Sequence, residues 1–214
     1  MRQPLPRPEA SAASRVCPWW LGWLLASPLR RLRQDPHAIL GPHVAEGMTV
    51  LEPGPGMGFF TLELARLVGP RGRVVAVDIQ PRMLEGLRRR ARKAGLHERI
   101  DARLATREGM GVEDLAGRAD FVLAFAAVHE FPDAGRFFAE AAAAMRPGAR
   151  LLLAEPTHHV SREEFEATLA LAARAGLRLE RRIEIRGSLS AVLQAAPAPQ
   201  GPHQGLETGG IGKE

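Results

Sequence analysis

The most informative segment reads Thr49-Val50-Leu51-Glu52-Pro53-Gly54-Pro55-Gly56-Met57-Gly58. Its apolar start predicts a strand, and the alternating glycines that follow predict a tight turn. A helix is expected next, with one apolar face and a Gly-Pro stop; that face is Phe60, Leu64, Leu67 and Val68, and the stop is Gly69-Pro70. Glycines at a strand-to-helix turn let the backbone approach a ligand without a Cβ in the way. The segment is therefore a candidate ligand site.

The glycine spacing argues against two common phosphate-binding loops. A dinucleotide fingerprint that starts at Gly54 would need its third glycine where Phe59 stands. A phosphate-cradling P-loop would need a Lys-Ser or Lys-Thr pair, and none follows. The turn is consequently expected to bind a ligand other than a pyrophosphate.

Outward from this turn, strand-like runs alternate with helical patterns, which predicts a parallel sheet covered by helices. The further strands are expected at 73–77, 100–104, 121–127, 151–154, 177–185 and 189–193, and the further helices from Pro81, at 134–145 and at 161–174. Ser161 and Glu164 form a predicted capping box. Arg186-Gly187-Ser188 is too short for a parallel crossover, so the last two strands should form an antiparallel hairpin.

A carboxylate ends the second predicted strand. Asp78 lies where an acidic side chain can accept hydrogen bonds from both hydroxyls of a ribose. The acidic-x-Gly-x-Gly-x-Gly pattern from Glu52, followed by this acid and by the terminal hairpin, resembles the class I S-adenosylmethionine-dependent methyltransferases. The resemblance covers about residues 40–194, and Arg146-Pro147-Gly148 resembles the family's turn before strand five.

The resemblance implies an α/β fold: a Rossmann-like three-layer sandwich with a mostly parallel seven-stranded sheet and a C-terminal antiparallel hairpin. It also implies S-adenosyl-L-methionine as the cofactor. Glu52 would then lie near the methionine amino group, the glycine loop along the methionyl chain, and Asp78 at the ribose. The implied cofactor-binding residues are Glu52, Gly54, Pro55, Gly56, Gly58, Asp78, Ile79, Thr106, Phe125 and Ala126. The family's acid near the adenine has no counterpart in Ala105-Thr106-Arg107-Glu108.

Methyl transfer requires mainly that the acceptor and the methyl group are held in line and that water is excluded. A base is needed only if the acceptor must lose a proton, and His129 follows strand four where such a base would lie. Glu130 is the second catalytic candidate, to orient His129 or to contact the substrate; equally, the pair could only cap the next helix. The substrate candidates are Trp20, Trp23 and Glu155, with His158 and His159 near the same crevice. No metal site is predicted, because the H-E-x-x-H spacing is absent.

Composition narrows the choice of partners. The 214 residues fit one domain, with hydrophobic residues at 45% and a net charge of +5. The densest basic run, Arg88 to Lys93, lies on one predicted helix, and with no Tyr and three Trp the chain offers few stacking platforms for bases. A lone Cys17 and no span-length apolar segment favour a cytoplasmic protein without a membrane partner. The oligomeric state stays open.

The expected organisation is a disordered tail at 1–14, a helical cap at 15–40, the methyltransferase domain at 41–194 and a disordered tail at 195–214. Strand four ends in Phe125-Ala126-Ala127-Val128-His129, without the Asn-Pro-Pro-Tyr signature of adenine and glutamine amino methylation. We therefore expect methyl transfer to a small molecule. RNA or protein methylation and a non-catalytic S-adenosylmethionine-binding regulator remain alternatives.

Overall fold

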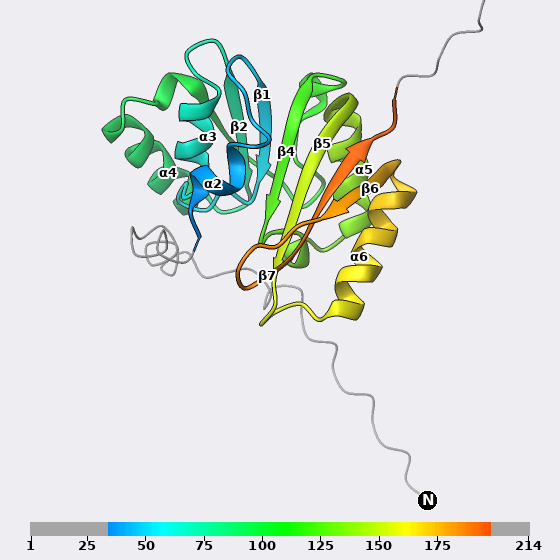
Figure 1. The fold of residues 1–214 in the computed structure, drawn as a ribbon. Coiled ribbons are helices and arrows are strands. Elements are labelled where there is room, and N and C mark those ends of the chain that lie inside the picture. The colour runs from blue at the N-terminus through cyan, green and yellow to red at the C-terminus, as the bar shows by residue number, and fades with distance from the viewer. Residues whose placement is uncertain (1–33, 198–214) are drawn as a thin grey trace, which may run out of the picture.

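The computed structural model describes residues 34–197, and these contain a seven-stranded sheet in the order β3-β2-β1-β4-β5-β7-β6 (Figure 1). All neighbouring strands are parallel except β7, which runs antiparallel to both β5 and β6. The strands are β1 (Thr49–Pro53), β2 (Arg73–Asp78), β3 (Ile100–Leu104), β4 (Ala119–Phe125), β5 (Met145–Pro156), β6 (Leu177–Arg182) and β7 (Ser188–Ala195). This confirms the predicted fold class, including the terminal hairpin.

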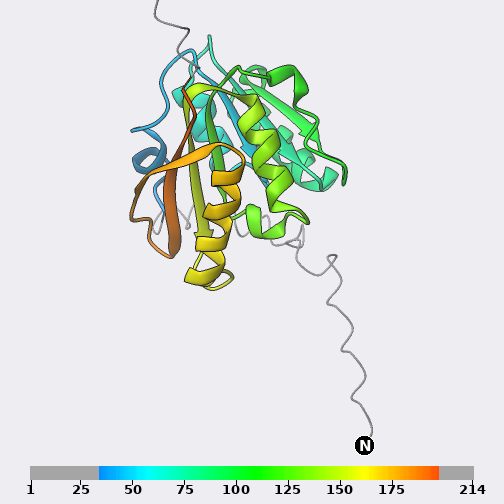
Figure 2. The same ribbon diagram turned by 90° about the vertical axis from the view of Figure 1, so that its right-hand side faces the viewer.

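Helices cover both faces of the sheet. The α-helices are α2 (Pro36–Leu40), α3 (Thr61–Leu67), α4 (Pro81–Lys93), α5 (Ala134–Ala144) and α6 (Arg162–Arg174). Helices α2, α3 and α4 share one face, and α5 and α6 lie side by side over the other, where Figure 2 shows them in front of the strands. The capping box of α6 forms as predicted, because the Ser161 and Glu164 side chains each accept the other's backbone N–H.

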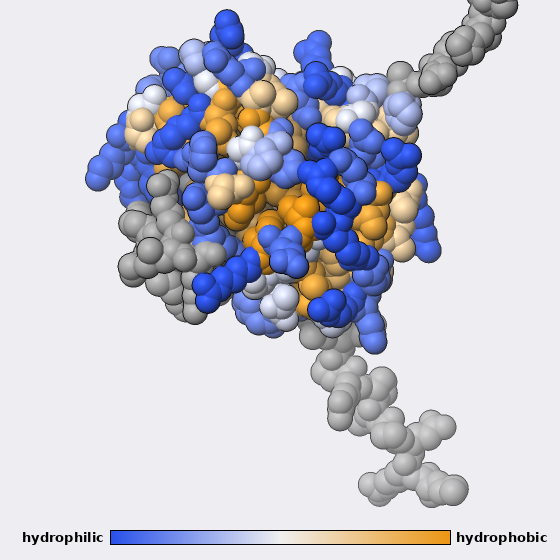
Figure 3. Space-filling model, in the orientation of Figure 1, coloured by the Kyte–Doolittle hydropathy of each residue, from blue (hydrophilic) through white to orange (hydrophobic). Residues whose placement is uncertain are grey.

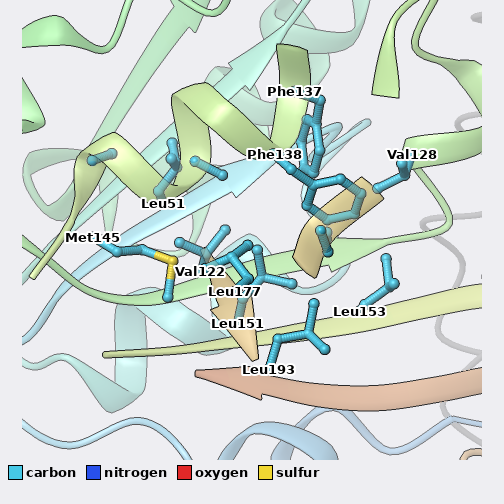
Figure 4. Packing of buried hydrophobic residues seen from close by; sticks show 14 of the residues in the cluster. Leu51, Val122, Val128, Phe137, Phe138, Met145, Leu151, Leu153, Leu177 and Leu193 are labelled. Carbon is cyan, nitrogen blue, oxygen red and sulfur yellow. The ribbon is translucent and has the colours of Figure 1, made fainter. Parts of the chain in front are cut away.

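The largest apolar cluster lies between the sheet and helices α5 and α6 (Figure 4). Phe137 and Phe138 of α5 are almost fully buried against residues of the central strands, among them Leu151 and Leu153 of β5. On the other face, a second cluster of buried apolar residues packs α2 and α3 against the central strands, and Figure 3 shows apolar residues near the middle of this side of the molecule. Burial on both faces explains why the central strands read as continuous apolar runs in the sequence.

Strand β5 begins six residues before the predicted start at Leu151, so the prediction of a separate turn at Pro147-Gly148 was wrong. Met145 already pairs with Ala119, and the register then shifts before Arg150 pairs with Phe121. The intervening residues form a bulge in which Gly148 has a φ of +74°, a value that suits glycine. The helix before it accordingly ends at Ala144.

Three further strand predictions differ from the structure. The predicted strand 177–185 ends at Arg182. Residues 100–103 of β3 are all half-buried and Leu104 is exposed, so the predicted alternation of buried and exposed residues is absent. The reason is that β3 is an edge strand with a neighbour on one side only. Strand β4 ends at Phe125 rather than Ala127, because Ala126 has a φ of +52° and leaves the extended conformation.

The predicted tail at 1–14 and most of the predicted cap at 15–40 lie outside the described residues, as does nearly all of the tail at 195–214. The described part of the cap contains α2, which begins with Asp35 capping the helix and is joined to α3 through a His37–Glu63 contact of 3.0 Å. Within residues 34–197, no helix has the length and apolar character needed to cross a membrane.

Candidate functional site

The carboxyl ends of β1, β2, β4 and β5 meet at one edge of the sheet, since these strands are parallel. The loop after β1 contains three glycines with positive φ: +69° at Gly54, +54° at Gly56 and +84° at Gly58. A Cβ on Gly54 would lie 2.8 Å from the Cβ of Ala127, and one on Gly58 would lie 2.4 Å from Leu87 of α4. These two glycines therefore permit close packing within the protein.

Gly56 has a different environment. A Cβ built on it would meet no atom within 4 Å, so its free side faces open space at the sheet edge. Its N–H donates a 3.2 Å hydrogen bond to Oδ2 of Asp78. The middle of the loop thus combines exposed backbone with a fixed position beside the acid of β2, as a ligand-binding loop requires.

Asp78 lies at the end of β2 and is only 8% exposed. Its Oδ1 accepts the N–H of Gln80 at 2.8 Å, and its Oδ2 accepts that of Gly56. Burial raises the pKa of Asp78 to about 6, against the opposing effect of the N–H groups of Gln80, Gly56 and Ile79. Each carboxylate oxygen retains further acceptor capacity, which two ribose hydroxyls could use.

Glu52 is the second buried acid of the site. It lies in β1, is 3% exposed, and its Oε2 has no hydrogen-bond partner among the described residues. The pKa of Glu52 is raised to about 8, mainly by burial; the Thr61 side chain lowers it and the charge of Asp78 raises it. The Thr61 hydroxyl lies outside good hydrogen-bond geometry. A buried carboxyl with one unpartnered oxygen fits a cationic ligand group such as the amino group of a methionyl chain.

Ile79, one of the predicted cofactor-binding residues, directly follows Asp78. Ile79 is 43% exposed and Leu104, at the end of the adjacent β3, is 54% exposed. Thr106 is exposed in a turn, where its N–H donates to the carbonyl of Gly109 and its hydroxyl accepts from the N–H of Glu108. Exposed apolar side chains beside Asp78 suit a flat heteroaromatic ring.

At the end of β4, Phe125 and Ala126 face different surroundings. Phe125 is 8% exposed and packs against Phe60 with ring centroids 4.3 Å apart. Ala126 is partly exposed, and its N–H donates a 2.7 Å bond to the carbonyl of Ala154. Its left-handed conformation is the sole positive φ of a non-glycine residue in the range 34–197 and turns the chain at the sheet edge.

His129 lies in the short 3-10 helix Val128–Glu130 that follows β4, and it is oriented by Glu155 rather than by Glu130. Its Nδ1 is hydrogen-bonded to Oε2 of Glu155, whose Oε1 accepts the N–H of Val128 at 2.9 Å. Glu130 Oε1 is 4.0 Å from Nε2 of His129, beyond hydrogen-bonding distance. Sequence reasoning could not find this pairing, because 26 residues separate the two partners.

Glu155 was predicted to contact the substrate, and that contact stays a prediction. The side chain is 1% exposed and both of its oxygens are engaged inside the protein. His159 stacks on His129 with ring centroids 5.5 Å apart, and His158 contacts His159. In the described part of the chain, no three His, Cys, Asp or Glu side chains are grouped to hold a metal ion. Trp20 and Trp23 lie outside the described residues.

Electrostatics at His129 result from opposing effects. Burial alone would lower its pKa, but the hydrogen bond and charge of Glu155, with the charge of Glu130, raise the pKa of His129 above the ordinary value of 6.5. Burial and the neighbouring His158 and His129 lower the pKa of His159. The two stacked rings therefore differ in basicity, and His129 is the stronger base.

Comparison with known proteins places this geometry in a family. The family of methyltransferase domains matches residues 45–186, inside the predicted domain at 41–194. The ubiquinone biosynthesis O-methyltransferase of Methylocella silvestris is 36% identical over 124 residues, which are 58% of this chain and 46% of that protein. The arsenite methyltransferase of Halobacterium salinarum is 31% identical over 112 residues, 52% and 28% of the two chains. This chain spans about half or less of these relatives.

Solved structures agree with the family match. A S-adenosylmethionine-dependent methyltransferase from Aquifex aeolicus has a TM-score of 0.74 at 25% identity, covering 85% of this chain and all of that one. The [4+2]-cyclase SpnF shares the fold alone, with a TM-score of 0.66 at 13% identity over 76% of this chain and 80% of the other. Three features fit S-adenosyl-L-methionine, the cofactor of the family: the open side of Gly56, the buried Oε2 of Glu52 that has no hydrogen-bond partner, and the buried carboxyl of Asp78. This chain belongs to the class I S-adenosylmethionine-dependent methyltransferases.

Proposed function

We propose that the protein transfers the methyl group of S-adenosylmethionine to a small-molecule acceptor. The observation that carries the proposal is the contact between the glycine loop and the segment after β4: a Cβ on Gly54 would collide with Ala127, two residues before His129. The cofactor loop and the candidate base are thus held at one sheet edge. When bound there, the cofactor would supply a methyl group on a positively charged sulfur, and the sulfur would keep the electron pair of the broken carbon–sulfur bond.

The chain's own residues would perform distinct tasks in this site. Asp78 would hold the ribose, Glu52 would hold the methionyl amino group through its unpartnered Oε2, and the exposed side of Gly56 would border the methionyl chain. Ile79 would cover the adenine edge, and Phe125 and Ala126 would border the methyl group from β4. His129 would accept a proton from the acceptor at Nε2.

Two findings support a small acceptor over a polymer. The relatives above are named as a methyltransferase of ubiquinone biosynthesis and an arsenite methyltransferase, and both names refer to small molecules. The arginines of the basic run are in part used within the protein: Arg88 donates to the carbonyl of Ala102 and Arg90 to that of Met57. The run is therefore less free to bind phosphates than its sequence suggests. A cytoplasmic location remains a prediction from the lone Cys17.

The proposal is tested by supplying the purified protein with methyl-labelled S-adenosylmethionine and a cell extract separated into small molecules, RNA and protein. We expect label in the small-molecule fraction, with none from a His129→Ala variant that still binds the cofactor. Label in RNA or protein instead would overturn the acceptor class. Label in no fraction, with cofactor binding intact by calorimetry, would favour the non-catalytic regulator, a use of the fold that only a turnover measurement excludes.

A further inference from the structure

A carboxylate that is almost fully buried accepts a hydrogen bond from one ring nitrogen of His129. Glu155 is 1% exposed, yet both its oxygens accept hydrogen bonds, Oε1 from the Val128 N–H and Oε2 from Nδ1 of His129. Burial of a charge is costly unless it is satisfied in this way. Because Val128 directly precedes His129, the same carboxylate fixes both the backbone and the ring of the short helix after β4.

This arrangement determines which nitrogen of His129 carries the proton. A carboxylate is an acceptor only, so the neutral ring must place its proton on Nδ1 and leave the lone pair on Nε2. The nearest carboxylate oxygen to Nε2, Oε1 of Glu130, is 4.0 Å away, and the His129 side chain is 20% exposed. Nε2 is therefore a proton acceptor directed away from Glu155, and Glu155 opposes the alternative tautomer.

We infer that Glu155 is the positioning residue for His129, and that the site is therefore built for an acceptor whose nucleophilic atom carries a proton: a hydroxyl, a thiol or an N–H group. The inference rests on the proposed function. In the step it implies, the acceptor atom bonds the methyl carbon, the carbon–sulfur bond breaks with its electrons on sulfur, and the acceptor's proton moves to Nε2 of His129. A tertiary amine or a thioether would have no proton to give, and the Glu155–His129 pair would serve no purpose for it.

The groups around His129 are consistent with a base that works near neutral pH. They are Glu155 at the end of β5, Glu130 on the same short helix, and His158 and His159 in the segment after β5. The two glutamates raise the pKa of His129 and therefore its strength as a base, against the effect of burial. The Glu155→Gln variant retains the shape of the side chain but removes its charge, and its amide can no longer accept from both partners.

The first test is independent of turnover. Nitrogen-15 NMR of the histidine rings, assigned with a His129→Gln variant, reports the tautomer and the pKa of His129 directly. We expect the neutral ring to carry its proton on Nδ1 in the native protein, with a pKa above 6.5, and the Glu155→Gln variant to lower that pKa. Glu163→Gln, which removes an exposed charge from α6, is the matched control and should leave both unchanged. A neutral ring protonated on Nε2 in the native protein would overturn the positioning role.

The second test uses the product isolated in the turnover assay. We expect the methylated atom to be an oxygen, sulfur or nitrogen that carried a proton, and the rate to fall at low pH with the pKa found by NMR. Glu155→Gln should lower kcat/KM at least about tenfold and move this acid limb to lower pH, without weakening cofactor binding. A methyl group on an atom that had no proton would overturn the acceptor class. A total lack of turnover would instead refute the proposed function, and the NMR result would still decide the role of Glu155.

Discussion

Asp78→Asn should make the protein more stable relative to the native chain as the pH rises, while it weakens cofactor binding. The folded-state pKa of Asp78 is about 6, above its ordinary value of 3.8, so ionisation of this buried carboxyl opposes folding. The stability that the protonated form provides is present at low pH and is lost as the pH rises through about 6. The asparagine side chain does not ionise and avoids this loss.

The magnitude follows from the two pKa values. Between pH 4.5 and pH 8, ionisation of Asp78 removes about 2 kcal/mol from the free energy of unfolding of the native protein. The asparagine side chain also offers one acceptor oxygen instead of two to the N–H groups of Gly56 and Gln80. This loss should cost about 1 to 3 kcal/mol at pH 4.5 and at pH 8 alike. The difference between variant and native protein should therefore change by about 2 kcal/mol over this range, or roughly 4 to 8 °C in Tm.

Thermal unfolding at both pH values measures this difference, and calorimetry with S-adenosylhomocysteine measures binding. Loss of charge-assisted bonds to the ribose should raise Kd at least about tenfold. Asp114→Asn is the control, because Arg103 holds the pKa of that exposed carboxyl at about 2 and its neutralisation should bring no stabilisation at pH 8. A stability difference that is equal at pH 4.5 and pH 8 would refute the burial argument, and unchanged affinity would refute the ribose assignment.

Two further predictions concern the glycine loop and Asp120 of β4. Gly56→Val should keep the native circular dichroism spectrum, because its side chain would enter open space at a cost of about 1 to 2 kcal/mol in backbone strain, but should abolish cofactor binding in calorimetry. Gly58→Val should instead lower the unfolding temperature, because its side chain would collide with Leu87. Equal cofactor binding by both variants would contradict the different roles assigned to the two glycines. Asp120→Ala should cost about 1 to 3 kcal/mol in urea unfolding, because Asp120 accepts the N–H of Thr49 at 2.7 Å and pairs with Arg146 at 2.6 Å; a variant as stable as the native protein would show that water replaces both partners.

Local sequence determined the elements and the cofactor loop. The turn at 54–58 depends on glycines that alone adopt positive φ readily, and the capping box at Ser161 depends on residues three apart, so both could be predicted from neighbouring positions. The terminal hairpin followed from the length of a connection. Asp78 could be placed at the site because the carboxyl ends of parallel strands share one edge.

Contacts between distant segments were decided by the tertiary structure. Glu155 and His129 belong to different strand ends, and only the β4–β5 pairing brings them together; sequence reasoning had favoured Glu130 because it is adjacent. The same holds for the bulge at Pro147-Gly148, which reads locally as a turn but is drawn into β5 by pairing with β4. Propensity and periodicity act over a few residues, whereas the orientation of a side chain depends on whichever segment the sheet places beside it.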